Sequence, residues 1–199
     1  MKRGNPQGKG LVPALEAWND TQPVQVVSPR PARTLLADFC ASSLVLAACF
    51  DFRPVAGNSY HLYRCGDVWR LSLISPREWG ARRPGMHVAR CDLRQDMTWS
   101  LVAAENLSES PDVVAALERH MEGFLAAVDT DERLVDTLPF HVSELPFYPR
   151  LLASALARSL RNNLQCSGLD AASGRKLLTA TESPAELLQI LPPQAPTSS

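Results

Sequence analysis

The chain has 199 residues, of which 45% are hydrophobic and 21% are charged, and its formal net charge is −1 at pH 7. This length and composition predict one globular domain, with at most a small appendage, that buries a substantial core. A net charge this close to zero disfavours nucleic acid as a partner, because general affinity for phosphate groups requires a basic surface.

Charge is unevenly distributed along the chain. Residues 53–98 hold eight arginines and four acidic residues, whereas residues 105–144 hold ten acidic residues and two arginines. The two segments either complement each other within the fold or leave an anion-binding surface on the basic one. We favour complementarity within the fold.

The sequence predicts a cytoplasmic protein that does not enter a membrane. Its first ten residues are polar and have no apolar core of the kind found in signal peptides. The longest apolar run, residues 35–50, contains Asp38 and is shorter than the ~20 residues of a membrane-spanning helix. The five cysteines have no paired spacing, which fits a reducing compartment better than a disulfide framework.

The first predicted segment in chain order is an extended arm over residues 1–30, which are rich in Gly, Pro, Asn and Gln. Residues 31–50 follow with apolar side chains at helical spacing, among them Leu35, Phe39 and Leu44. Small residues fill the other side of this helix. A helix that is apolar on nearly all sides is expected at the centre of the core, packed against a sheet.

A β-hairpin is predicted around Gly66 and Asp67, which lie between two runs of alternating apolar and polar residues. Gly followed by Asp suits a two-residue type II′ turn, and such a turn sets Leu62 opposite Leu71. The face turned toward the core is then Tyr60, Leu62, Trp69, Leu71 and Leu73. The opposite face is His61, Tyr63, Cys65, Val68, Arg70 and Ser72.

Residues 75–80 predict a single helical turn. Ser75 is a suitable N-cap, Pro76 fits the first helical position, and Glu78 lies where a capping box requires an acid. Gly80 can take the left-handed conformation that ends such a turn. We expect the turn to place Trp79 over one end of the sheet as a lid on the core.

Two further strands are predicted over residues 86–93 and 98–103, with Trp99, Leu101 and Ala103 on the buried face. Short connections favour pairing between strands that are neighbours in the sequence. The prediction is therefore an α+β fold in which a four-stranded antiparallel meander packs against the buried N-terminal helix.

The C-terminal half is predicted to be helical. Helices are expected over residues 110–128, 147–164 and 183–190, and residues 192–199 are expected to be a disordered tail. Residues 31–104 would form a helix-plus-sheet part, and residues 105–191 a helical part of the same domain.

A zinc site is suggested by a repeated His-x₃-Cys spacing, His61 with Cys65 and His87 with Cys91. Residues four apart on a strand are ~13 Å apart, so neither pair can chelate one ion. In a meander the second strand would also separate the first strand from the third. We therefore predict no metal, and the absence of dinucleotide and phosphate-loop motifs predicts no cofactor.

Two readings of the site remain open. Tyr63 opposite Arg70, with His61 beside Ser72, would form an aromatic and cationic sheet face, and Trp79 joins them as a candidate for binding a ligand or partner. A solvated face, or one covered by the C-terminal helices, is the plain alternative.

The rival reading is an enzyme, in which Glu78, His87 and Asp96 converge at one end of the sheet as an acid/base set. No known catalytic motif accompanies them.

Three motifs carry a family resemblance: Tyr60-His-Leu-Tyr63, Ser75-Pro-Arg-Glu-Trp-Gly80 and Asp96-Met-Thr-Trp99. Together with the opening Asn5-Pro-Gln-Gly-Lys-Gly10, the chain resembles a conserved bacterial family of unknown function. The resemblance implies a shared architecture and carries over no catalytic or binding residue.

The combined expectation is a cytoplasmic, non-enzymatic interaction or small-ligand-binding module. Its partner would be a protein or a small molecule, and association into a homodimer through exposed helix faces stays open. The alternative is a small enzyme that uses Glu78, His87 and Asp96.

Overall fold

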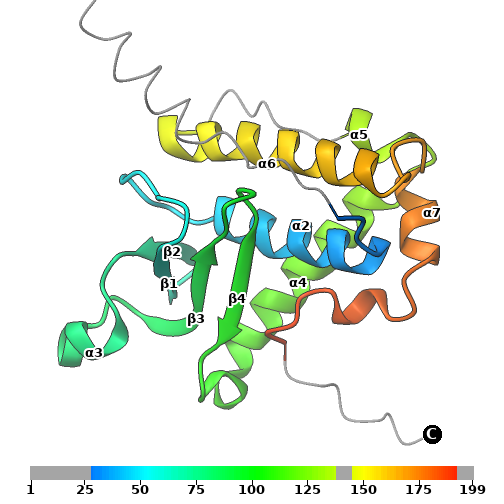
Figure 1. The fold of residues 1–199 in the computed structure, drawn as a ribbon. Coiled ribbons are helices and arrows are strands. Elements are labelled where there is room, and N and C mark those ends of the chain that lie inside the picture. The colour runs from blue at the N-terminus through cyan, green and yellow to red at the C-terminus, as the bar shows by residue number, and fades with distance from the viewer. Residues whose placement is uncertain (1–27, 138–144, 192–199) are drawn as a thin grey trace, which may run out of the picture.

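A computed structural model describes residues 28–137 and 145–191 (Figure 1). Most of the predicted arm and the predicted C-terminal tail lie outside the described residues. In chain order the described elements are α2 (Ala32–Leu46), β1 (Ser59–Cys65), β2 (Val68–Ser72), α3 (Pro76–Trp79), the 3-10 turn η1 (Gly80–Arg82), β3 (Met86–Leu93), β4 (Trp99–Ala103), the 3-10 turn η2 (Leu107–Glu109), α4 (Pro111–Val128), α5 (Leu134–Thr137), α6 (Phe147–Cys166), α7 (Gly174–Thr179) and the 3-10 turn η3 (Pro184–Glu186).

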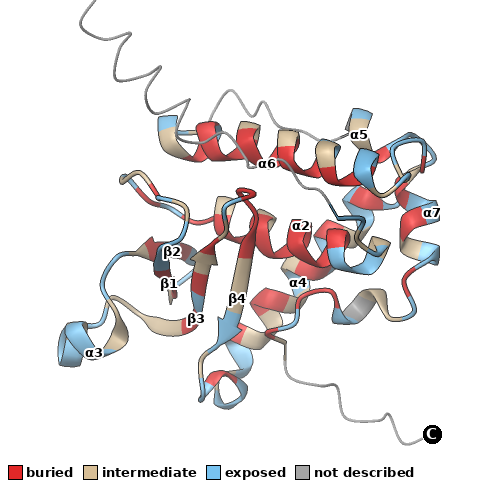
Figure 2. Ribbon diagram, in the orientation of Figure 1, coloured by how far each residue is buried: buried red, intermediate tan, exposed pale blue. Residues whose placement is uncertain are grey.

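The helix α2 is the centre of the molecule, as its apolar sequence predicted. It contacts β4, α4, α6 and α7 (Figure 1). Buried residues occupy nearly every side of it (Figure 2). The sheet, α2 and the C-terminal helices share one hydrophobic core that runs from Leu35 to Ile190. The predicted α+β class is confirmed.

The hairpin has the predicted register, with Leu62 opposite Leu71 and Tyr63 opposite Arg70. Gly66 has a φ of 58°, which the first position of a type II′ turn requires. The prediction that Leu73 faces the core was wrong, since this side chain is 60% exposed. Strand β2 ends at Ser72, so the alternation of faces stops before Leu73.

The strand order is β2-β1-β3-β4, so β1 lies between β2 and β3. All three pairings are antiparallel. This order corrects the sequential meander, because the chain passes through α3 and η1 after β2 and returns to the far side of β1. The helices α2, α4, α6 and α7 share a core with the sheet face that carries Leu62 and Leu71.

Both edges of the sheet have partners for part of their backbone. Cys49 forms a parallel bridge with Arg70 at the edge of β2, in which the Cys49 N–H donates to the Trp69 carbonyl over 2.8 Å. The Leu71 N–H donates in turn to the Cys49 carbonyl. At the other edge, the Trp99 N–H donates to Ser42 Oγ of α2 over 3.0 Å.

The capping box predicted for α3 is present. The Glu78 N–H donates to Ser75 Oγ, and the Ser75 N–H donates to the Glu78 carboxylate over 2.8 Å. Gly80 has a positive φ of 54°, but its ψ of −129° lies outside the left-handed helical region, and the chain continues into η1. Trp79 is half-buried and lies outside the core, so it does not cover the core as predicted.

The helical C-terminal half agrees with the prediction except at its end. Residues 184–186 form only a 3-10 turn where a helix over 183–190 was expected, and α5 and α7 were not anticipated. Leu101 is half-buried and Ala103 exposed, so Trp99 alone of the predicted set on β4 is buried. No helix within residues 28–137 and 145–191 is both long and apolar enough to cross a membrane.

Candidate functional site

A β-bulge brings His61 and His87 together on the outer face of the sheet. Leu62 pairs with Ala89, but Tyr63 pairs with His87, so Val88 is an extra residue in β3. Without the bulge His87 would lie opposite Arg64, on the inner face. Because cross-strand partners share a face, the bulge turns His87 to the side of His61, and Val88 and Ala89 are both fully buried.

The two imidazoles are in direct contact. His61 Nδ1 lies 3.3 Å from His87 Nε2, and the Tyr63 ring lies 5.3 Å from the His87 ring. Which nitrogen donates in this contact depends on the tautomers of the two rings. A hydrogen bond to the Ala89 backbone favours the protonated form of His87 and so raises its pKa.

Burial keeps this pair uncharged. Desolvation, the neighbouring His61 and Arg83 lower the pKa of His87 to about 4, against a smaller opposing effect of the Ala89 hydrogen bond. Desolvation also lowers the pKa of His61, with Arg90 acting in the same direction and Glu78 and Asp92 opposing it. Both rings are therefore neutral at pH 7.

The second feature is a groove of about 700 Å³ beside the edge of β2, which we call the hairpin groove. Its walls are residues 46–51, the hairpin residues Cys65, Val68, Arg70 and Leu71, and Leu145, Pro146 and Pro149 before and within α6. Most of these side chains are apolar. Arg70 and Asp51 are the charged residues of the wall, and neither forms an ion pair with another described residue.

Four of the five predicted binding residues share the outer face of the sheet, where His61 lies opposite Ser72 and Tyr63 lies opposite Arg70. Arg70 lines the hairpin groove, whereas His61 belongs to the histidine pair. Tyr63 is fully buried and its hydroxyl donates to the Ile74 carbonyl over 3.0 Å, which corrects the expected exposed aromatic face.

The other two predicted binding residues have local roles. Ser72 Oγ accepts from the Ile74 N–H over 3.0 Å. The Trp79 indole N–H is enclosed and has no hydrogen-bond partner among the described residues.

The predicted acid/base set is not assembled. His87 is the second residue of β3, and Asp96 follows the strand's far end at Leu93, about 20 Å away at ~3.3 Å per residue. Asp96 accepts hydrogen bonds from the Thr98 N–H and hydroxyl instead. The reason given against a metal between strands one and three was also wrong, because β1 and β3 are neighbours. Even so, the described residues contain no group of three or more His, Cys, Asp or Glu side chains that could hold a metal ion.

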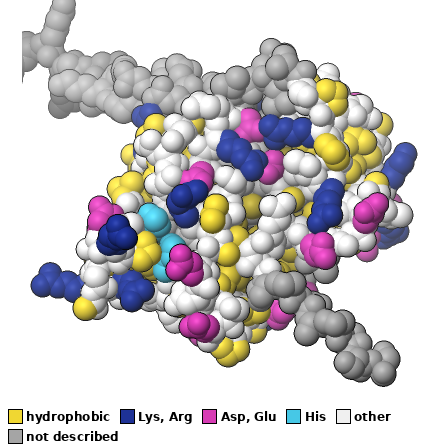
Figure 3. Space-filling view, turned by 60° about the horizontal axis from the view of Figure 1, so that its bottom comes forward, with side chains coloured by type: hydrophobic (Ala, Val, Ile, Leu, Met, Phe, Trp, Pro, Cys, Tyr) yellow, Lys and Arg dark blue, Asp and Glu magenta, His cyan; other side chains and the backbone are white. Residues whose placement is uncertain are grey.

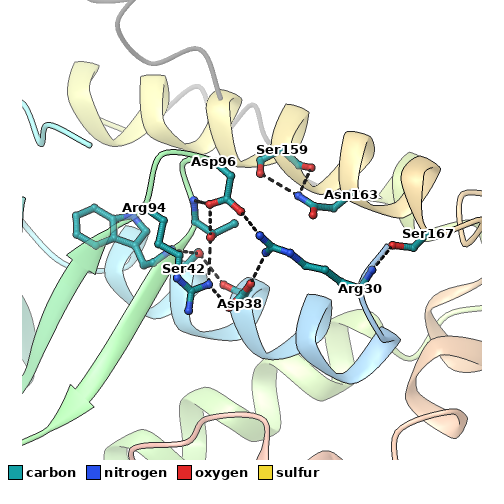
Figure 4. Close-up of polar contacts among 10 residues, drawn as sticks. Arg30, Asp38, Ser42, Arg94, Asp96, Ser159, Asn163 and Ser167 are labelled. Carbon is teal, nitrogen blue, oxygen red and sulfur yellow. Dashed lines mark hydrogen bonds and ion pairs between the residues drawn. The ribbon is translucent and has the colours of Figure 1, made fainter. Parts of the chain in front are cut away.

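Asp96 belongs to a network of opposite charges at the other end of the sheet (Figure 4). Arg30 reaches Asp38 and Asp96, each at 3.1 Å, and its backbone N–H donates to Ser167 Oγ after α6. Arg94 donates to Asp38 over 2.6 Å. Asp96 Oδ2 forms an ion pair with Arg30 but accepts no well-oriented hydrogen bond from a described residue. Desolvation raises the pKa of Asp38 although two guanidinium groups lie beside it. These groups hold each other in place.

The comparison with known proteins gives one match. A family described as "Protein of unknown function (DUF2452)" matches residues 29–122. The matched region includes α2, the whole sheet, the histidine pair and most of α4, so the predicted resemblance to a family of unknown function is confirmed at that level. It ends before the α6 residues of the hairpin groove. No curated protein and no solved structure matches the chain.

Sequence reasoning missed the histidine pair and the part of the groove formed by residues 46–51. One signal was present in the sequence: Val88-Ala89, two adjacent apolar residues, interrupts the alternation of β3. Such an interruption is typical of a bulge. The contact between residues 46–51 and β2 has no comparable signal.

Proposed function

We propose that the protein is a non-enzymatic, cytoplasmic binding module whose hairpin groove holds a small ligand with an apolar body and a carboxylate. The observation that carries the proposal is the groove itself. Its volume of about 700 Å³ lies within the ~300–1,000 Å³ of typical small-molecule sites. Like those sites, it combines an apolar wall with few charged groups.

Arg70 selects the charge of the ligand. Its guanidinium is exposed on the groove wall and has no carboxylate partner among the described residues. An arginine in this state supplies charge-assisted, fork-shaped hydrogen bonds to an incoming carboxylate. Asp51 on the same wall disfavours a second negative charge.

The proposed cytoplasmic location has separate support. Cys40, Cys49, Cys65 and Cys91 are free thiols. Free thiols persist in reducing compartments, where disulfides are rare.

Calorimetry with dodecanoate and its uncharged counterpart dodecan-1-ol tests the proposal. Arg70→Gln should weaken dodecanoate binding about tenfold, which is ~1.4 kcal/mol and the size of a charge-assisted hydrogen bond, and should leave dodecan-1-ol unchanged. Asp51→Asn should strengthen dodecanoate binding, because it removes a repulsion.

Arg82→Gln is the matched control, since Arg82 is an exposed arginine outside the groove wall, and it should alter neither ligand's affinity. Absence of dodecanoate binding would refute the proposal. So would an Arg70→Gln effect of equal size on the acid and the alcohol.

A further inference from the structure

We propose that the free edge of β4 is a dimer interface, at which two copies of this chain pair their β4 strands antiparallel about a two-fold axis beside Val102. The strand order places β4 at the edge of the sheet opposite β2. The interface is therefore separate from the hairpin groove, which lies beside β2, and it is independent of the ligand proposed for that groove.

The backbone of Leu101 and Ala103 points toward the open edge. Residues along an antiparallel strand alternately direct their N–H and C=O groups toward one neighbouring strand and away from it. The Trp99 N–H donates to Ser42 Oγ of α2, whereas the Ala104 N–H donates to a β3 carbonyl, which fixes the alternation. The register between β3 and β4 is unbroken, so Leu101 and Ala103 share the direction of Trp99. Their N–H and C=O groups have no hydrogen-bond partner in the part of the chain that the structure describes.

These unpaired groups match those of a second copy. When Val102 lies opposite its own copy, Leu101 lies opposite the second copy's Ala103, and each such pair exchanges two N–H···O=C hydrogen bonds. The two Val102 residues then form a non-hydrogen-bonded pair, the closer of the two kinds, in which the side chains touch. The Val102 side chain is 49% exposed in the single chain, so this contact would cover apolar surface that water now reaches.

The β4 edge lacks the features that keep strand edges apart. Natural edges are protected by charged residues, prolines or bulges. The strand reads Trp-Ser-Leu-Val-Ala, without a charge or a proline, and it has no bulge. The other edge of the sheet is already bridged by Cys49, so pairing at β4 closes with two copies instead of growing into a filament.

Charges at the two ends of β4 are complementary in this arrangement. Arg94 precedes the strand and, with Leu101, lines a cleft of about 180 Å³ at the start of the edge. Its Nη1 contacts Asp38 and Thr98, and its side chain is 40% exposed. Glu105 follows the other end of the strand, is exposed, and forms no ion pair with a described residue. Antiparallel pairing sets the basic end of one copy against the acidic end of the other.

The overall charge permits a second copy to approach. The net charge is only −1, and basic and acidic side chains are interspersed on the face of the molecule in Figure 3. Neither sign forms a field that would repel an identical surface. The paired segment is short, so we expect an interface near or below the ~1,200 Å² of weak complexes and a dissociation constant of roughly 10–100 μM.

Sedimentation of the full chain at concentrations from ~1 to ~300 μM tests the association, and wild type should change from monomer to dimer over this range. Val102→Lys sets two ammonium groups against each other at the axis and should weaken the dimer at least about tenfold. Val55→Lys is the matched control. Val55 is 47% exposed and precedes β1, so this variant should dimerise like wild type.

Cysteine cross-linking tests the register. The ~4.5 Å between the Cα atoms of a non-hydrogen-bonded pair lies within the ~4.4–6.8 Å range of disulfides. Oxidised Val102→Cys should therefore form a covalent dimer linked through residue 102, which peptide mass spectrometry separates from links made by native cysteines. Ser100→Cys is the control, since residue 100 and its copy would lie ~13 Å apart along the strands and should not link.

Three results would overturn the proposal. They are a wild-type chain that stays monomeric at ~300 μM, a dimer that Val102→Lys does not weaken, and a folded Val102→Cys variant that forms no link through residue 102. Circular dichroism confirms that each variant is folded. None of the substituted residues lines the hairpin groove, so these results do not bear on the ligand proposed there.

Discussion

At the scale of single residues, His87 combines a predictable position with an unpredictable environment. The sequence placed it on a strand, but its contact with His61 depends on a neighbouring strand and an extra residue in β3. Tyr63 is a similar case. Its cross-strand partner followed from the hairpin turn, whereas its complete burial depends on groups distant in sequence, such as His87.

The lowered pKa of His87 predicts how stability varies with pH. The unfolded chain binds a proton below about pH 6.5, whereas the folded chain does so only near pH 4. The contribution of neutral His87 is complete above pH 6.5 and is lost as the pH falls toward 4. For this half-buried ring we expect a loss of roughly 1–2 kcal/mol, after allowance for solvent screening.

Urea denaturation at pH 7.0 and pH 4.5 measures this difference. In His87→Gln the loss of unfolding free energy between pH 7.0 and pH 4.5 should be smaller by roughly 1–2 kcal/mol. Arg119→Gln should show the full loss seen in wild type. An identical decrease in wild type and His87→Gln would show that another group is responsible. His120, whose pKa is also lowered by burial, is the next candidate.

At the scale of elements, features that depend on adjacent residues could be predicted from the sequence, whereas contacts between distant parts of the chain could not. The turn at Gly66-Asp67 and the capping box of α3 depend on a few adjacent residues, and both were predicted correctly. The pairing of β1 with β3 was not, because short connections alone favour β2 as the neighbour of β3. Such long-range pairing depends on how the whole sheet covers α2.

The junction of α4 and α7 supplies a prediction at this scale. Gly174 opens α7, and a Cβ at this position would collide with the Val128 carbonyl at the end of α4. Gly174→Ala should therefore destabilise the protein by about 2 kcal/mol or more, since the two backbones must separate. Thermal unfolding measures the effect.

Gly123 is the matched control because a Cβ there meets open space within α4. Gly123→Ala should be neutral or stabilising by up to ~1 kcal/mol, from helix propensity. Equal melting temperatures for the two variants would contradict this account of the junction.

At the scale of the whole molecule, the network around Arg30 ties four separate parts together. Arg30 precedes α2, Asp38 lies within it, Asp96 lies in the β3–β4 turn, and Ser167 follows α6. Arg30→Met would leave two buried carboxylates without this cation. We expect a loss of about 2–4 kcal/mol, somewhat below that of a fully buried pair.

Arg33→Met is the control for this prediction. Arg33 pairs with Glu186 at the same 3.1 Å distance, but both side chains are exposed, so its loss should cost no more than ~1 kcal/mol. Chemical denaturation compares the two variants. A similar small effect in both would show that burial adds nothing to the Arg30 network.

The bridge between Cys49 and Arg70 also bears on how the protein behaves in concentrated solution. An uncovered strand margin recruits strands from other molecules and so seeds fibrils. Here the Cys49 carbonyl accepts from the Leu71 N–H, and the Cys49 N–H donates to the Trp69 carbonyl. At the opposite edge, the Ser42 hydroxyl oxygen accepts from the Trp99 N–H. Some of the backbone groups that would template a neighbouring chain are therefore already paired at both edges of the sheet, which disfavours fibril growth.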